Sequence, residues 1–370
     1  MLPVALRQVE RSNPAPMTGS TQRASREPNR GSTEQEPRLP DGLVTVTGAA
    51  GFLGSHVVEE LLARRHRVLA VDDLSSGSLD NLAAARTNPL LSVLIGSVAE
   101  KAIAARAAAA TSVFHLAGVV GVQRLAQRPV DVMHGNLRCT EVMLEASAQT
   151  GARILIASSS EVYGDGPSPF DESAAVNPGS ADNLRGGYAC AKAMGEWLAH
   201  AHARQHGLHA VVARLFNVVG PRQSGAYGMV LPRFVQQALA GDPITVFGDG
   251  SQTRCFAAVR EVAAALCDLL AAPLAIGATC NVGSDREVSV LQLAHLVKGA
   301  TRSASPVVLV PHDRVFPPGF TDPQRRVPSL DRLRSIVGWT PSKSIEAIVE
   351  DLCGEPASEP VQRALAARAV

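Results

Sequence analysis

A short apolar segment followed by three closely spaced glycines constrains this chain most. Residues 43–47 form an apolar, β-branched run typical of a buried parallel strand, and residues 55–65 have the spacing of an amphipathic helix. Glycines between a strand and a helix allow a tight turn and let backbone N–H groups approach a pyrophosphate, to which the helix N-terminus adds a partial positive charge. The predicted phosphate-binding segment comprises Gly48, Gly51, Phe52, Leu53 and Gly54.

A second apolar strand, residues 68–71, ends at Asp72 and Asp73. These carboxylates follow the glycines by about 20 residues, where an acidic side chain accepts hydrogen bonds from the adenosine ribose hydroxyls of NAD. A carboxylate at this place repels the 2′-phosphate of NADP. We therefore expect NAD as the cofactor, with Asp72 and Asp73 among the residues that bind it.

The strand and helix signals continue to alternate along the chain. Further strands are expected at residues 91–95, 113–118 and 153–158, and helices at 99–110 and 129–150. Such alternation predicts an α/β fold with a Rossmann-type doubly wound parallel sheet. Because ligands bind at the carboxyl ends of parallel strands, Leu116 and Ala117 are expected beside the cofactor.

The composition excludes several classes of function. The 35 basic and 34 acidic residues give a net charge of +1, so no electrostatic basis exists for binding nucleic acid or a membrane surface. No apolar run reaches the roughly 18–20 residues that a membrane span needs. The six scattered cysteines lack metal-site spacing, so we expect no metal and reduced thiols in a cytoplasmic protein.

Residues 1–40, polar and without apolar periodicity, are expected to form a disordered tail, and residues 356–370 a C-terminal tail.

Candidate catalytic residues gather around one strand and one helix. The strand at residues 154–157 runs into Ser159 and Glu161, whose side chains could bond a sugar oxygen and move a proton. Tyr188 and Lys192 are four residues apart at the start of a helix that extends to about residue 206, which places them on one face. A nearby ammonium favours the phenolate and lowers the pKa of the tyrosine, which would make Tyr188 a base near neutral pH.

In this order and spacing, Gly48, Gly51, Gly54, Asp72, Ser159, Tyr188 and Lys192 resemble the extended short-chain dehydrogenase/reductases. The similarity covers residues 43–350 and is closest to the branch of nucleotide-sugar epimerases, dehydratases and decarboxylases. It implies that Tyr188 takes the proton of the sugar 4-hydroxyl while hydride passes to NAD. Lys192 would hold the nicotinamide ribose, and Ser159 would bond the same sugar oxygen. Relatives often carry an adenine-binding Asp after the third strand, where this chain has Ser97 and Val98, so a weaker contact is expected.

The resemblance extends into the second half of the chain, where Gly and Pro interrupt the pattern. Residues 41–222 would form the NAD-binding domain with the catalytic Ser, Tyr and Lys. Residues 223–355 would form a smaller, mainly sugar-nucleotide-binding region, with some segments returning to the Rossmann sheet. Guanidinium groups suit a diphosphate, and two arginines match family positions that bind it, Arg254 and Arg326. The expected substrate-binding residues are Asn217, Arg222, Arg233, Arg254 and Arg326.

Two further expectations rest on the same resemblance. Relatives often form homodimers through the helix of the Tyr–Lys pair and the helix before it, here residues 187–206 and 129–150. The acidic residue that follows the second proline in relatives is Ser329 here, which puts that local contact in doubt.

Glu161 bears on which reaction follows C4 oxidation. Simple 4-epimerases that resemble this chain usually have Thr or a small residue there, and glucose-type 4,6-dehydratases have Asp where this chain has Ser160. Mannose-type dehydratases accept Ser-Glu but usually prefer NADP. UDP-glucuronate decarboxylases look most similar, which implies formation of UDP-xylose from a UDP-sugar substrate. Two alternatives stay open: a 4-epimerase of UDP-glucose or UDP-glucuronate, and a non-catalytic NAD-binding regulator.

Overall fold

The computed structural model describes residues 38–224, 229–316 and 323–354. Most of the two expected tails lies outside these residues. Leu39 is an exception, because it is described and is 6% exposed within the hydrophobic core. The packed part of the chain therefore begins before residue 41, where the sequence analysis placed its start.

The centre of the fold is a seven-stranded parallel sheet in the order β11-β6-β5-β4-β1-β2-β3. Chain order reverses between β1 and β4, and such a switch point opens a crevice at the carboxyl ends of the strands. Every residue of β4 is buried, as expected for a strand covered on both faces. The strands are β1 (Leu43–Thr47), β2 (Arg67–Asp72), β3 (Leu91–Ile95), β4 (Ser112–His115), β5 (Arg153–Ser159), β6 (Ala210–Leu215) and β11 (Thr279–Val282).

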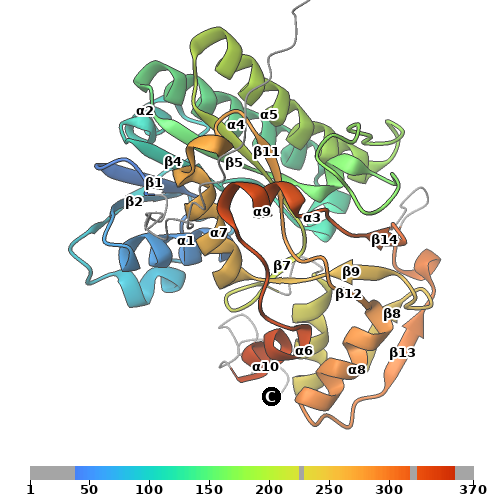
Figure 1. The fold of residues 1–370 in the computed structure, drawn as a ribbon. Coiled ribbons are helices and arrows are strands. Elements are labelled where there is room, and N and C mark those ends of the chain that lie inside the picture. The colour runs from blue at the N-terminus through green and yellow to red at the C-terminus, as the bar shows by residue number, and fades with distance from the viewer. Residues whose placement is uncertain (1–37, 225–228, 317–322, 355–370) are drawn as a thin grey trace, which may run out of the picture. The chain divides into compact units, whose positions relative to one another are not determined.

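Helices cover both faces of this sheet (Figure 1). One core cluster packs the sheet against α1 (Phe52–Ala63), α7 (Val259–Ala271) and α9 (Asp331–Val337). A second cluster packs it against α2 (Lys101–Ala108), α4 (Pro129–Thr150) and α5 (Leu184–His206), and the short α3 (Val122–Gln127) precedes α4. The expected doubly wound α/β fold is confirmed.

The remaining elements form a smaller assembly with its own core of residues such as Leu231, Phe234 and Leu293. Its helices are α6 (Val230–Ala240), α8 (Val290–Ala300) and α10 (Ile345–Gly354). Its strand sets are β8 (Ile244–Phe247) with β13 (Val307–Val310), β7 (Val218–Val219) with β10 (Ala257–Ala258), and β9 (Thr253–Cys255) between β12 (Glu287–Ser289) and β14 (Arg325–Arg326). Between these elements the chain returns to the large sheet through α7 and β11. Short 3₁₀ turns occupy η1 (Leu79–Ala85), η2 (Ser160–Tyr163), η4 (Pro273–Ala275) and η5 (His312–Arg314).

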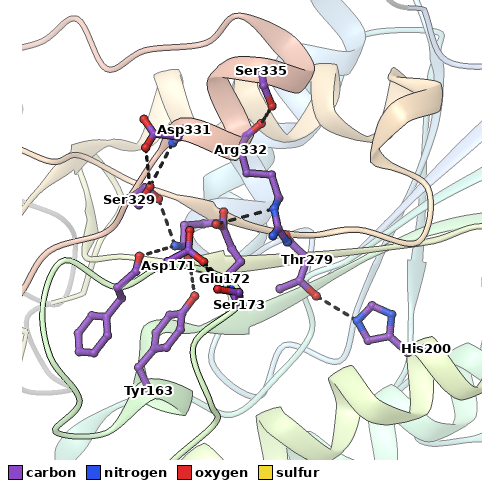
Figure 2. Close-up of polar contacts among 12 residues, drawn as sticks. Tyr163, Asp171, Glu172, Ser173, His200, Thr279, Ser329, Asp331, Arg332 and Ser335 are labelled. Carbon is purple, nitrogen blue, oxygen red and sulfur yellow. Dashed lines mark hydrogen bonds and ion pairs between the residues drawn. The ribbon is translucent and has the colours of Figure 1, made fainter.

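Asn281, near the end of β11, joins three segments that are distant in sequence. Its side-chain oxygen accepts a hydrogen bond from the Tyr163 hydroxyl at 2.7 Å. Its side-chain nitrogen donates to the carbonyls of Phe170 at 3.0 Å and Ser329 at 3.1 Å, and its backbone N–H donates to Glu172 at 2.8 Å. Figure 2 shows Tyr163, Glu172 and Ser329 converging on this point. The anchor ties η2 and the loop before α5 to the segment that follows β14.

Candidate active site

The glycine-rich loop brings three parts of the backbone into close approach. Gly48 has φ +68°, and a Cβ there would lie 2.8 Å from the Ala117 nitrogen at the end of β4. A Cβ on Gly54, in the first turn of α1, would lie 2.0 Å from the Gly48 carbonyl oxygen. Gly51 precedes α1, and no side chain among the described residues caps this helix. Its first N–H groups therefore suit a pyrophosphate.

We expect Gly54→Ala to weaken NAD binding by at least about tenfold. The methyl group overlaps the Gly48 carbonyl, and overpacking of about 1–3 kcal/mol would displace the loop that approaches the pyrophosphate. Titration calorimetry with NAD measures the effect. Gly299→Ala in α8 is the control, because its Cβ would meet nothing within 4 Å, and its NAD affinity should equal wild type. Equal affinities for all three proteins would contradict this account of the loop.

Asp72 is fastened to the same loop. Its carboxylate is 8% exposed and accepts hydrogen bonds from the backbone N–H groups of Ala50 at 2.9 Å and Leu74 at 2.8 Å. Burial raises the pKa of Asp72, and the two backbone hydrogen bonds oppose that rise. Each carboxylate oxygen has a further acceptor site, so the group fits ribose hydroxyls. Asp73 is exposed and accepts from the Ser75 N–H at 2.9 Å, which makes Asp72 the more enclosed of the two.

The other expected cofactor residues follow the ends of β3 and β4. The Ser97 hydroxyl accepts a hydrogen bond from the Ala99 N–H at 3.4 Å, and Val98 is buried. Ala117 donates its N–H to the Thr47 hydroxyl at 3.2 Å, and Leu116 packs against the core. All four therefore lie at the carboxyl edge of the sheet, on the two sides of the glycine-rich loop.

The four expected catalytic residues come together at the end of β5. Ser159 ends that strand, Glu161 lies in η2, and Tyr188 and Lys192 lie on α5. The side chains of Tyr188 and Ser159 are hydrogen-bonded, and the Lys192 ammonium is 6.0 Å from the centre of the Tyr188 ring. Lys192 also donates to the Ala157 carbonyl at 3.0 Å. The phenol of Tyr188, which can donate or accept a proton, therefore lies close to the hydroxyl of Ser159 and the ammonium of Lys192.

The acidities of these groups differ from the sequence expectation. Burial raises the pKa of Tyr188 and the negative charge of Glu161 adds to that rise, whereas the hydrogen bond with Ser159 lowers it. Burial also lowers the pKa of Lys192 to about 8. The lowered tyrosine pKa expected from Lys192 is therefore not produced by the protein groups alone, because burial and the charge of Glu161 outweigh the hydrogen bond with Ser159.

Glu161 is clamped by two arginines. Arg185 donates to its carboxylate at 2.7 and 3.3 Å, and Arg326 donates to it at 2.6 and 3.3 Å. Burial disfavours the charge of Glu161, but the two guanidinium groups outweigh burial and hold the pKa of this carboxyl well below its usual range. Glu161 is therefore an ionised carboxylate at the working pH of almost any enzyme.

The expected substrate residues fall into two groups. Arg326 and Arg254 are register neighbours on β14 and β9, so Arg254 lies next to the clamp. The other three are engaged elsewhere in the fold. Arg222 forms an ion pair with Glu59 of α1, and the Asn217 amide donates to the Cys255 carbonyl at 3.0 Å. Arg233 lies 3.9 Å from the centre of the Phe247 ring and donates to the Thr245 carbonyl at 2.8 Å.

Sequence reasoning missed Arg185 and a buried support beneath the site. Glu196 on α5 accepts hydrogen bonds from Arg214 on β6 at 2.7, 3.0 and 3.2 Å and from Ser158. One signal could have found Arg185. It occupies the first turn of α5, where a cation opposes the helix dipole and so needs an external partner.

The sequence and the fold match those of known proteins. The model of the NAD dependent epimerase/dehydratase family matches residues 44–283. The chain belongs to this family. It is therefore an NAD-dependent enzyme of nucleotide-sugar chemistry, and the glycine-rich loop and Asp72 fit that cofactor.

Individual family members cover most of the chain. A UDP-N-acetyl-alpha-D-glucosaminuronate decarboxylase from Bacillus cytotoxicus is 34% identical, over 81% of this chain and 93% of that protein. UDP-glucuronic acid decarboxylase 6 of Arabidopsis thaliana is 31% identical, over 86% and 93%. The crystal structure of a Thermus thermophilus UDP-glucose 4-epimerase in complex with NAD superposes with a TM-score of 0.72 at 29% identity, over 85% of this chain and 100% of that one.

Proposed function

We propose that this enzyme decarboxylates UDP-glucuronate to UDP-xylose through transient oxidation at C4 of the sugar. The clamp of Glu161 by Arg185 and Arg326 beside Tyr188 is the observation that carries the proposal. One carboxylate against two guanidinium groups leaves an excess positive charge, which a uronate carboxylate would balance and a neutral hexose would not. The decarboxylases among the relatives support the same choice.

The chemistry follows from the residues at the end of β5. NAD, when bound, supplies the acceptor and donor of hydride. Tyr188 removes the proton from the sugar 4-hydroxyl, and the Ser159 hydroxyl holds the same oxygen. The 4-keto group makes the C5 carboxylate that of a β-keto acid, which loses carbon dioxide, and C5 then takes up a proton. Tyr188 returns a proton to the C4 oxygen when the 4-keto pentose is reduced.

The remaining expected site residues take supporting roles in this proposal. Lys192 holds the nicotinamide ribose, and the cofactor lies along the glycine-rich loop, Asp72 and the ends of β3 and β4. Arg254 binds the diphosphate beside the clamp. Asn217, Arg222 and Arg233 contact the sugar nucleotide in this proposal, and in this structure each of them also bonds to another part of the fold. Residues 41–222 thus bind mainly NAD, and residues 223–355 mainly the sugar nucleotide.

The second candidate is a 4-epimerase acting on a UDP-hexose or UDP-uronate. The structural likeness to a UDP-glucose 4-epimerase favours it, because C4 oxidation by the same Tyr and Ser would start either reaction. In that case Glu161 has no chemical role. A regulator without catalysis is disfavoured, because Ser159, Tyr188 and Lys192 are all present and brought together.

Proton NMR of the purified protein incubated with NAD and UDP-glucuronate tests the proposal. Loss of the C5 signal of the uronate, with growth of a pentose spin system and release of carbon dioxide, is the expected result. Formation of UDP-galacturonate would make the protein an epimerase instead. Interconversion of UDP-glucose and UDP-galactose, with UDP-glucuronate unchanged, would also overturn the decarboxylase assignment.

We also propose a homodimer that forms through α4 and α5. These helices lie side by side on one face of the sheet (Figure 1). Large apolar side chains on them face outward: Val130 is 59%, Met194 43% and Trp197 59% exposed. Burial of such side chains against a second copy is favourable by about 25 cal/mol per Å² of apolar surface.

Trp197→Asp is expected to convert the dimer to a monomer, because it replaces a large exposed apolar side chain of this face with a charge. Light scattering after size-exclusion chromatography measures the mass. Leu274→Asp is the matched control, because Leu274 is 75% exposed in η4, away from α4 and α5, and this variant should remain dimeric. A monomeric wild type would refute the dimer, and a dimeric Trp197→Asp variant would refute this interface.

A cytoplasmic location is proposed on two grounds. All six cysteines lie within the described residues, and none is in a disulfide. UDP-sugars and NAD are the substrate and cofactor assigned above. As a separate observation, no helix in the described residues is long and apolar enough to cross a membrane.

A further inference from the structure

Arg185 contacts both carboxylate oxygens of Glu161 through one edge of its guanidinium group. Its Nη2 lies 2.7 Å from Glu161 Oε1 and its Nε 3.3 Å from Oε2. The two side chains are 15% and 20% exposed. A fork of this kind fixes the orientation of a carboxylate and also favours its ionised form. A single point contact does not fix the orientation.

Helix stability does not account for an arginine at this position. Arg185 lies in the first turn of α5, and its N–H is capped by the Asn183 side chain at 3.0 Å. A cation near a helix N-terminus is unfavourable by about 0.3–1 kcal/mol. The ion pair with Glu161 offsets this unfavourable free energy. The presence of an arginine at position 185 is therefore explained by the active site.

Arg185 and Arg326 reach Glu161 from different parts of the structure. Arg326 lies on β14, three residues before Ser329 and its contact with Asn281. Arg185 lies three residues before Tyr188, within the same helix. Of the two arginines, Arg185 is therefore the one that links the carboxylate to the helix that carries the phenol.

We propose that Arg185 is a positioning residue that holds Glu161 at a fixed place relative to Tyr188 and neutralises its charge there. The inference rests on the proposed function, in which Tyr188 removes a proton and the clamp of Glu161 balances the charge of the uronate carboxylate. It adds a role to a residue outside the Ser–Tyr–Lys set. Arg185 need not touch the substrate.

The charges that face Glu161 define the consequence of losing Arg185. Arg185 and Arg326 favour its ionised form, and Glu161 in turn disfavours the phenolate of Tyr188. Without Arg185, the pKa of Glu161 rises, so its carboxylate protonates at a higher pH. The less compensated charge of Glu161 also raises the pKa of Tyr188. Both effects displace the acidic limb of the rate profile toward higher pH.

Steady-state kinetics across pH on the NAD-loaded enzyme test the proposal. For Arg185→Gln we expect kcat to fall about 10²-fold, KM to rise by a smaller factor because the excess positive charge of the clamp is lost, and the acidic limb to move upward in pH. Arg185→Lys restores the charge without the fork, so the limb should return toward its wild-type position while kcat recovers only in part. Arg204→Gln, exposed in the last turn of the same helix, should match wild type. A raised KM with unchanged kcat would show that Arg185 binds substrate, and an unchanged pH profile would also overturn the proposal.

Infrared titration of the carboxyl bands separates this inference from the proposed function, because it needs no substrate. The Glu161 band is identified as the band lost in Glu161→Gln. In Arg185→Gln that band should show protonation at higher pH than in wild type, and in Arg185→Lys at an intermediate pH. If the wild type does not act on UDP-glucuronate but the band shifts as expected, the proposed function fails and the link from Arg185 to Glu161 stands. A band unmoved in both variants refutes the link, whatever the enzyme's substrate.

Discussion

Tyr188→Phe is expected to reduce turnover by roughly 10²–10⁴-fold, the usual contribution of a positioned acid or base. The substitution removes the hydroxyl that is bonded to Ser159 and keeps the ring beside Lys192. The fold and the glycine-rich loop do not depend on that hydroxyl, so NAD binding should be retained. Product formation by NMR and NAD affinity by calorimetry, measured on the same preparation, separate the two effects.

Tyr163→Phe is the matched control for this variant. It removes the hydroxyl that donates to Asn281 at 2.7 Å, which lowers the free energy of unfolding by about 1 kcal/mol but leaves the Ser159–Tyr188 pair in place. Turnover of this variant should stay near wild type. Full activity of Tyr188→Phe would remove Tyr188 from the chemistry and would revive a reading of the chain as a non-catalytic NAD-binding protein.

Arg214→Met is expected to lower the free energy of unfolding by about 3–5 kcal/mol, because it leaves Glu196 as an uncompensated charge beneath the site. Both side chains of the pair are about 5% exposed or less, and Arg214 also stacks over the Tyr163 ring at 4.6 Å. Glu196 follows Lys192 by one helical turn, so loss of the pair should also disturb α5 near Lys192. Urea denaturation of both proteins measures the difference.

Two controls separate burial from charge in that experiment. The double variant Glu196→Gln/Arg214→Met removes the stranded charge and should recover part of the lost free energy of unfolding. Arg138→Met breaks a pair with Glu141 in which both side chains are more than 40% exposed, and should change the free energy of unfolding by less than about 1 kcal/mol. If Arg214→Met and Arg138→Met lowered the free energy of unfolding equally, this would contradict the claim that the buried pair contributes more to stability than the exposed pair.

Most of the sheet could be predicted from the sequence because β1 to β5 each carry a local signal, whereas β11 was not among the expected strands. A glycine-rich turn, an acidic strand end and repeated apolar runs led to the correct fold class, and the expected helix at residues 129–150 coincides with α4. The helix of Tyr188 begins earlier than the expected range of residues 187–206, at Leu184, because Asn183 caps it. Arg185 lies within those added residues, so its role was hidden by a boundary error.

The clamp around Glu161 could not be predicted, because its members are brought together by tertiary structure alone. Arg326 is 165 residues from Glu161 in sequence, and its position depends on the pairing of β14 with β9 and on the Asn281 anchor. The resemblance implies that Arg326 binds a diphosphate, and the structure also places its guanidinium against the Glu161 carboxylate. The raised pKa of Tyr188 could not be predicted for a related reason. It is caused mainly by burial, which a four-residue spacing between Tyr188 and Lys192 does not reveal.

The most direct test of the central claim follows the carboxylate carbon of the substrate. UDP-glucuronate labelled with ¹³C at C6 is incubated with the NAD-loaded enzyme, and ¹³C NMR records where the label goes. The account predicts that the label leaves the nucleotide sugar and appears as carbon dioxide and bicarbonate in wild type, and that Tyr188→Phe retains it in UDP-glucuronate. Label that stays in a nucleotide sugar while the wild-type enzyme converts its substrate would contradict decarboxylation and establish an epimerase.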